Sequence, residues 1–159
     1  MNEDARFEDG REAPLNLGAM DDQDVKILST LVQDAVFPAT EMKWLPSERR
    51  FALLINRFRW EDLPAAERRK RAVERVQSLL VVDNVLRVAS QGIDRQDADT
   101  ILSVLTVTFE KGDDGAGFVE LTLAGDGGIR LEVEALEMTL KDVTRPYAAP
   151  SRSAPRHDV

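Results

Sequence analysis

Hydrophobic and polar residues alternate along this chain first with the period of a helix and then with the period of strands. Between Asp21 and about Asp34, apolar residues recur at steps of three and four and form one stripe of a helix, made of Val25, Leu28, Leu31, Val32 and Ala35. Asp21, Asp22 and Asp24 come first, and carboxylates there accept hydrogen bonds from the first backbone N–H groups and favour the positive end of the helix dipole. The pattern predicts an N-terminal helix that ends before Pro38.

The pattern after this helix has a period near two, which indicates strands. In residues 49–58, Phe51, Leu53 and Ile55 point to one face, and Ala52, Leu54 and Phe58 point to the other. Apolar side chains on both faces are typical of a central strand that is covered on each side. Five further runs predict strands at 76–82, 85–90, 101–110, 117–124 and 128–143. Residues 35–45 predict a weaker edge strand because Pro38 interrupts them, and residues 63–70 predict a short helix.

Turn-forming residues suggest how these strands connect. Asp83-Asn84 predicts a hairpin between 76–82 and 85–90, and the glycine-rich run 125–128 predicts another between 117–124 and 128–143. The last strand changes phase at Ala135-Leu136, which indicates a β-bulge. We therefore expect an α+β fold that is mainly antiparallel β: a twisted sheet of seven or eight strands, or a small barrel, with the N-terminal helix packed on it.

The length of 159 residues predicts a single domain. Residues 1–13 are polar and predict a disordered N-terminal tail. Residues 144–159 contain Pro146, Pro150 and Pro155 among small and polar residues, and they predict a disordered C-terminal tail. The folded part is then expected at 14–143.

Composition excludes several kinds of chemistry. The chain has no cysteine, and its one histidine, His157, lies in the predicted tail, so thiolate chemistry, a histidine-based triad and a histidine-ligated metal lack their residues. Asp94, Asp97 and Asp99 lack the central glycine and the distal glutamate of a calcium loop. The sequence predicts no cofactor, no metal site and no catalytic residues, which favours a protein that is not an enzyme.

Charge and hydropathy bear on location and partners. No apolar run approaches the roughly 18 residues of a membrane span. The acidic N-terminus lacks the order of a secretory signal, and with the absence of cysteine this predicts a cytoplasmic protein without membrane contact. The net charge of -8 argues against nucleic acid as a partner. Residues 43–75 differ from the rest because they carry ten basic and five acidic side chains.

This basic stretch also contains both tryptophans and supplies the candidate binding residues, which are Trp44, Arg49, Arg50, Arg57, Arg59 and Trp60. The arginines could bind phosphate or carboxylate beside a stacking indole. The alternative is structural, with the arginines paired to Glu48, Glu61 and Glu67. The first hypothesis for function is a cytoplasmic interaction module that binds an unknown protein partner or associates with itself. The second is a barrel that binds a small anionic ligand, or an enzyme of unidentified activity.

Three segments resemble a known family: QDAV at residues 33–36, ERRFAL at 48–53, and NRF followed by Trp60. They are similar to those of small bacterial proteins catalogued as a domain of unknown function. The resemblance covers about Leu15 to Tyr147, which is nearly the whole predicted folded part. It implies a self-contained folding unit, and it carries over no catalytic or ligand-binding residue.

Overall fold

The protein is an α+β structure dominated by antiparallel strands, as the sequence predicts. The computed structural model describes residues 14–68, 74–94, 97 and 99–148. The expectation of seven or eight strands is wrong, because eleven occur in these residues. The helices are α2 (Asp22–Val32) and α3 (Leu63–Arg68), and the strands are β1 (Asn16–Ala19), β2 (Val36–Pro38), β3 (Met42–Leu45), β4 (Arg50–Phe58), β5 (Glu74–Val82), β6 (Val85–Gln91), β7 (Ile101–Lys111), β8 (Gly117–Leu123), β9 (Gly128–Val133), β10 (Met138–Asp142) and β11 (Tyr147–Ala148).

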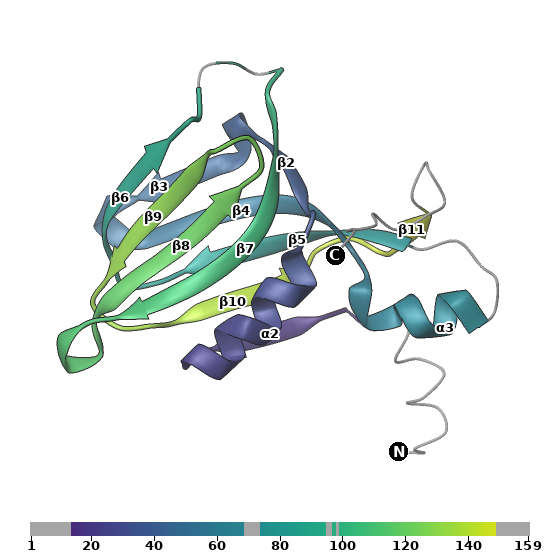
Figure 1. Ribbon diagram of the computed structural model, residues 1–159, viewed down its shortest axis with the longest axis horizontal. Helices are drawn as coiled ribbons and strands as arrows, with labels where there is room; N and C mark the ends of the chain where they lie inside the picture. Colours follow the sequence, from purple (N-terminus) through teal and green to yellow (C-terminus); the bar gives the residue numbers. More distant parts are fainter. Residues whose placement is uncertain (1–13, 69–73, 95–96, 98, 149–159) are drawn as a thin grey trace.

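The strands form one sheet in the order β1-β10-β5-β4-β2-β7-β8-β9-β6, with β3 paired to β4 and β11 paired to β5. The sheet folds over so that β7, β8 and β9 lie in front of β4 and β5 (Figure 1). The short strand β2 joins the two halves, since Val36 pairs with Asn56 of β4 and also with Ser103 of β7. The expected barrel is wrong, because β1 and β6 end the path without pairing with each other.

Two predicted connections are wrong for a common reason. β5 does not form a hairpin with β6; it pairs with β4 and β10, while β6 pairs with β9. The phase change at Ala135-Leu136 is a break between β9 and β10 rather than a bulge. At both places the chain crosses between the two halves of the sheet. The crossings bond to each other, because Asn84 accepts from the Glu134 amide at 2.9 Å and Glu137 accepts from the Asp83 amide at 2.9 Å.

Helix α2 matches its prediction closely. The Asp21 carboxylate accepts the Asp24 amide at 2.8 Å, and the helix ends at Val32, shortly before Asp34 adopts a positive φ of 62°. Its buried residues Val25, Leu28 and Val32 belong to the predicted stripe. The helix packs mainly on β7. Among the described residues, no helix is long and apolar enough to cross a membrane.

One hydrophobic core runs between the two halves of the sheet and under α2. β4 alternates as predicted, with Phe51, Leu53 and Ile55 buried in this core. A second, small cluster joins Phe58 to Ala66 of α3, with Trp60 and Leu63 packed against it. The core therefore holds both halves of the sheet together, and the small cluster attaches α3 at the end of β4.

The C-terminal boundary of the folded part lies beyond the expected residue 143. Tyr147 and Ala148 form β11 on β5, and the Tyr147 hydroxyl donates to Asn56 at 2.7 Å. Thr144 also accepts the Gln77 amide, at 3.0 Å. The predictions for residues 1–13 and 149–159 lie outside the described residues. For the predicted short helix at 63–70, the same holds for its last two positions.

Candidate functional site

The six predicted binding residues do not form one surface. Arg49 and Arg50 lie where β4 begins, and Arg57 and Arg59 lie where it ends. An eight-residue step along a strand spans about 26 Å. Arg49 and Arg50 are exposed, while Arg57 and Arg59 are 0% and 2% exposed.

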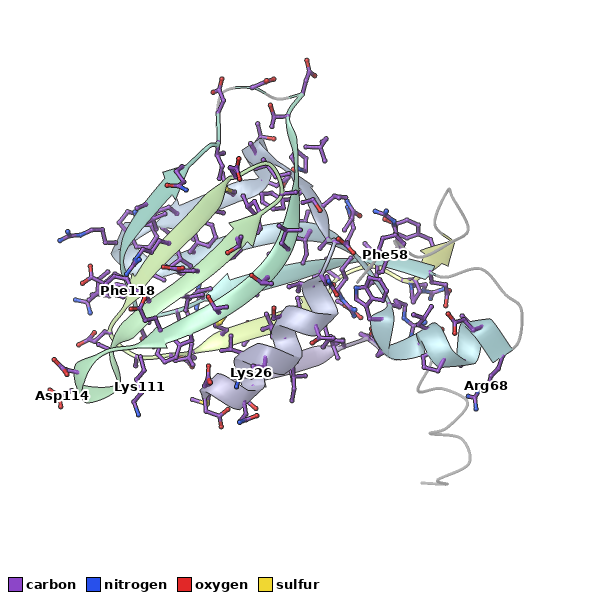
Figure 2. All side chains as sticks on the ribbon, in the orientation of Figure 1. Lys26, Phe58, Arg68, Lys111, Asp114 and Phe118 are labelled. Carbon is purple, nitrogen blue, oxygen red and sulfur yellow. The ribbon has the colours of Figure 1, made fainter. Side chains whose placement is uncertain are left out.

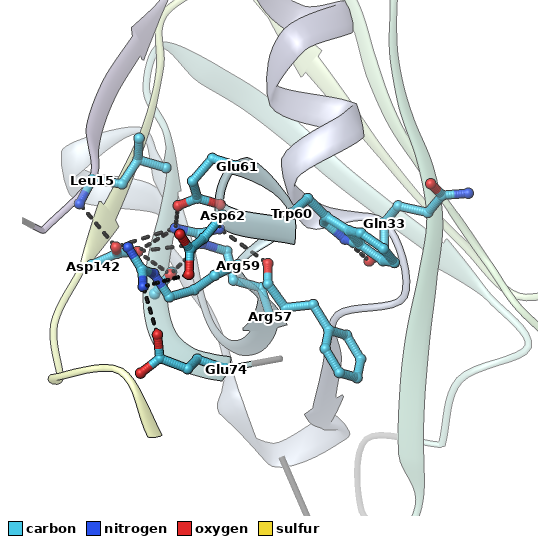
Figure 3. Close-up of polar contacts among 11 residues, drawn as sticks. Leu15, Gln33, Arg57, Arg59, Trp60, Glu61, Asp62, Glu74 and Asp142 are labelled. Atoms are coloured by element: carbon cyan, nitrogen blue, oxygen red, sulfur yellow. Dashed lines mark hydrogen bonds and ion pairs between the residues drawn. The ribbon is translucent and has the colours of Figure 1, made fainter. Parts of the chain in front are cut away.

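Arg57 is enclosed by polar partners (Figure 3). Its Nη1 and Nη2 donate to the two carboxylate oxygens of Glu61 at 2.9 Å each, and Nη2 also donates to Asp142 at 2.9 Å. Nε donates to the Ser78 hydroxyl at 3.0 Å, and Ser78 donates to Asp142 at 2.7 Å. The Leu15 amide donates to the second oxygen of Asp142 at 2.8 Å. These contacts tie β4, β5, β10 and the N-terminal segment together.

Burial alone would lower the pKa of Arg57, because it penalises the charged guanidinium. The hydrogen bonds and negative charges of Glu61 and Asp142 outweigh burial and raise the pKa above its ordinary value. Arg57 therefore stays charged and has its donors committed inside the protein. This corresponds to the structural alternative, in which the arginines pair with acids such as Glu61.

Arg59 and the two tryptophans are also held by internal contacts. Arg59 donates to Glu74 at 2.9 Å and lies 3.5 Å from the Asp62 carboxylate. The Trp60 indole donates to the Gln33 carbonyl at 2.9 Å, and its ring centroid lies 5.7 Å from that of Phe58. Trp44 is half-buried on β3 and packs against the main core. Each tryptophan therefore packs against one of the two hydrophobic clusters.

Arg49 and Arg50 lie beside the two chain crossings. Arg49 donates to Glu134 at 2.9 Å, and its backbone carbonyl accepts the Val85 amide at 2.9 Å. Arg50 donates to Asp83 at 2.8 Å, and this hydrogen bond is the main reason that the pKa of Arg50 is raised. The two arginines join the start of β4 to the start of β6.

A different feature, outside the six predicted binding residues, is the open edge of the sheet at β6. This strand has seven residues and pairs with β9 alone. Five of the seven are exposed, including Leu86 at 47%. Three shorter strands also have an unpaired edge: β1 and β3 have four residues each and β11 has two. β7 pairs with β2 only over residues 101–103, but α2 packs on it, and the Ser29 hydroxyl of α2 accepts the Val107 amide at 2.9 Å. Short edges are one way in which proteins prevent unwanted strand pairing, and β6 lacks that protection.

The direction of the backbone groups follows from the register. Along a strand in an antiparallel sheet, successive residues direct their N–H and C=O groups to opposite neighbours. The Glu134 amide donates to Asn84, so even-numbered residues of β9 face β6. The even-numbered residues Glu132, Arg130 and Gly128 of β9 pair with Arg87, Ala89 and Gln91 of β6, so these three residues of β6 direct their backbone groups toward β9. Val88 and Ser90 lie between these positions and direct their N–H and C=O groups away from the sheet. In the described part of the chain, no backbone group is bonded to them there.

A groove of about 580 Å³ extends from β6 across β9 and β8 to Leu105 of β7. β6 contributes Ala89, Ser90 and Gln91 to its lining, and the turn between β8 and β9 contributes Asp126. The volume falls within the range of roughly 300 to 1,000 Å³ that is typical of binding pockets. Leu105, Thr122 and the backbone of Gly125, Gly127 and Gly128 add apolar and polar surface.

Two ionic side chains in the groove, Glu120 and Arg130, are fixed to each other. Arg130 donates to Glu120 at 2.8 Å and stacks over the Phe118 ring at 4.0 Å (Phe118 is labelled in Figure 2). Arg130 is thus occupied, while Asp126 adds a carboxylate to the lining. The charge of the groove does not favour the anionic ligand of the second hypothesis.

Close backbone packing shapes one end of the groove. Gly92 follows β6 with a φ of 68°, and a Cβ at Gly92 would lie 3.0 Å from the Cα of Gly127. The end of β6 and the β8–β9 turn therefore touch through backbone atoms, and this contact places Asp126 near Gln91. Among the described residues, no group of three or more His, Cys, Asp or Glu side chains is placed to hold a metal ion.

Sequence signals for this site are weak. The run Val85–Gln91 predicts a strand, but an edge strand and an inner strand of such composition look alike. Whether a strand pairs with one neighbouring strand or with two is decided by residues far away in the sequence. The periodicity of a single sequence does not report these contacts.

Most of the chain matches the model of one protein family. A family model described as "Protein of unknown function (DUF2948)" matches residues 15–157. This confirms the resemblance that the sequence suggests and extends it beyond Tyr147. No curated protein and no solved structure matches the chain.

Proposed function

The chain belongs to the DUF2948 family, whose description assigns no activity, and we propose from its geometry that it is a protein-interaction module. It binds an extended segment of a partner protein, which adds a strand to the sheet at β6. The observation that carries the proposal is the seven-residue edge with outward-directed backbone groups at Val88 and Ser90. The proposal includes a cytoplasmic location, which the cysteine-free composition favours.

Strand addition explains why edge and groove occur together. The partner's backbone bonds to the edge and supplies affinity, while its alternate side chains enter neighbouring pockets and supply specificity. Ala89, Ser90 and Gln91 belong both to the edge strand and to the groove lining. A segment paired with these residues therefore has every second side chain next to the groove.

A proline substitution tests the proposal at the backbone. Ser90→Pro removes an N–H that points away from β9, so the β6–β9 pairing is retained while strand addition is blocked. Peptides selected from a displayed library on the wild-type protein are titrated against the variant by calorimetry. We expect Ser90→Pro to weaken binding at least about tenfold, which corresponds to about 1.4 kcal/mol.

Gly18→Pro is the matched control. Gly18 lies on β1 at the opposite end of the sheet path, and its position alternates with residues 17 and 19, which bond to β10. A Cβ at Gly18 meets no atom within 4 Å. The control should therefore bind the selected peptides as the wild type does. Peptides that bind both proline variants and the wild type equally would refute the proposal, as would a wild type that stays monomeric and yields no binder from the library.

A further inference from the structure

We propose that the segment which pairs with β6 is β6 of a second copy of this chain. This inference rests on the proposed function and names the partner. The two strands run antiparallel about a two-fold axis that passes beside Ala89, perpendicular to the sheet. The two sheets then continue into one another across the contact.

The register satisfies the backbone groups on both sides. A two-fold axis at Ala89 places Val88 of one copy opposite Ser90 of the other, and the reverse. These are the two residues of β6 that direct N–H and C=O groups outward, so each facing pair exchanges two hydrogen bonds. The same axis places Arg87 opposite Gln91 of the second copy.

Charge complementarity favours this partner. The chain carries a net charge of -8, so two copies repel at most orientations. β6 contains no acidic residue, and its one charged side chain, Arg87, is 82% exposed. Arg87 lies 3.6 Å from the Glu132 carboxylate on β9, and such a surface ion pair is weak and leaves the guanidinium open to a second carboxylate. The residue that faces Arg87 in the second copy, Gln91, lines the groove together with Asp126 and Glu120. Because Glu120 is paired with Arg130, the carboxylate left for the contact is Asp126, and each copy directs its Arg87 guanidinium toward Asp126 of the other.

The contact between Arg87 and Asp126 of the second copy depends on where the two-fold axis crosses β6. An axis at Val88 would instead place Arg87 opposite Ala89, farther from the Asp126 turn, and would bring the two Arg87 side chains closer together. The axis at Ala89 also closes the assembly as a dimer, because each β6 edge is consumed by the other. The shorter edges at β1, β3 and β11 differ from β6 in length and sequence, so they do not extend the contact into a fibre.

A charge-exchange experiment tests the contact in the full chain. Sedimentation velocity is measured for the wild type, Arg87→Glu, Asp126→Lys and an equimolar mixture of the two variants, from about 1 to 300 µM, a range that covers weak self-association. The wild type should shift with concentration from 17.8 kDa toward twice that mass. Each variant alone places like charges opposite each other and should dissociate at least about tenfold more easily.

The mixture is the decisive arm. When one chain carries Arg87→Glu and the other Asp126→Lys, both cross-contacts again join opposite charges, so the mixture should recover the mass of the dimer. Loss of folding in either variant does not produce this recovery, and circular dichroism of each variant provides the control. A wild type that stays at 17.8 kDa throughout, or a mixture that stays monomeric, would overturn the inference.

The two proposals fail in different ways. If the wild type is monomeric but binds selected peptides in a manner that Ser90→Pro abolishes, only self-pairing is wrong and the interaction module stands. If Ser90→Pro changes neither peptide binding nor mass, the β6 edge has no role and both proposals fall.

Discussion

Arg57 illustrates how an arginine in a basic stretch of sequence becomes part of the protein's interior. Its guanidinium is fully buried, and Glu61, Ser78 and Asp142 accept its hydrogen bonds. The attraction within such a group offsets the cost of removing charges from water only while all partners are present. Removing one partner of the network would therefore cost more free energy of unfolding than the intact network contributes.

Replacing Arg57 should strongly destabilise the fold. Arg57→Leu leaves the Asp142 carboxylate buried without its cation, so we expect the free energy of unfolding to fall by about 3 to 5 kcal/mol. Urea denaturation monitored by tryptophan fluorescence measures this. Arg49→Leu is the control: its ion pair with Glu134 is exposed at 60% and 64%, and pairs of this kind contribute about 0 to 1 kcal/mol. Equal losses in the two variants would contradict the structural role of Arg57.

Asp97 should titrate below its usual range. The Thr100 hydroxyl donates to it at 2.7 Å and is the main cause of a pKa below 3.8, with the Asp99 amide second at 3.0 Å. Because the pKa of Asp97 is lowered in the folded state, the contribution of Asp97 to the stability of the fold is present above its unfolded-state pKa. This contribution is lost as the pH falls through the folded-state pKa. In Thr100→Val, the pKa of Asp97 should rise toward 3.8 in an NMR titration. An unchanged pKa would show that the hydroxyl does not act on the carboxylate.

At the scale of elements, local periodicity predicted α2 and β4 well. Each buries the face that its pattern predicts, because an amphipathic period reports which side chains leave water together. The connections were harder to predict. Asn84 has a φ of 60°, a conformation that suits a hairpin turn and also the crossing between halves of the sheet that it forms here. Turn residues therefore indicated that the chain changes direction, but they did not indicate which two strands pair with each other.

The β6 edge makes a prediction for hydrogen exchange. The Ala89 amide points toward β9, whereas the amides of Val88 and Ser90 point outward. In dilute protein, where self-pairing is absent, Ala89 should exchange about fivefold more slowly than these neighbours, as one hydrogen bond of about 1 kcal/mol implies. NMR exchange rates resolve this alternation. Uniform rates along β6 would contradict the assigned bonding pattern.

Over the whole molecule, distant segments meet at two places that no local pattern shows. At one, the crossings near residues 83–85 and 134–137 bond to each other and to Arg49. At the other, Asp142 near the end of the chain accepts hydrogen bonds from Leu15 near its beginning and from Arg57 in the middle. The four arginines predicted to bind were consequently divided between the two ends of β4, and each pairs with an acidic side chain of the fold.

The sequence alone determined the secondary-structure class, the N-terminal helix, the central strand and the family, because these depend on side-chain patterns over a few residues or on matched motifs. The tertiary structure decided which strands pair, that the sheet stays open, which arginines are buried and which edge remains available. These features depend on contacts between residues that are often more than 60 positions apart, such as Arg57 with Asp142, and the free energy of such contacts leaves no periodic trace along the chain.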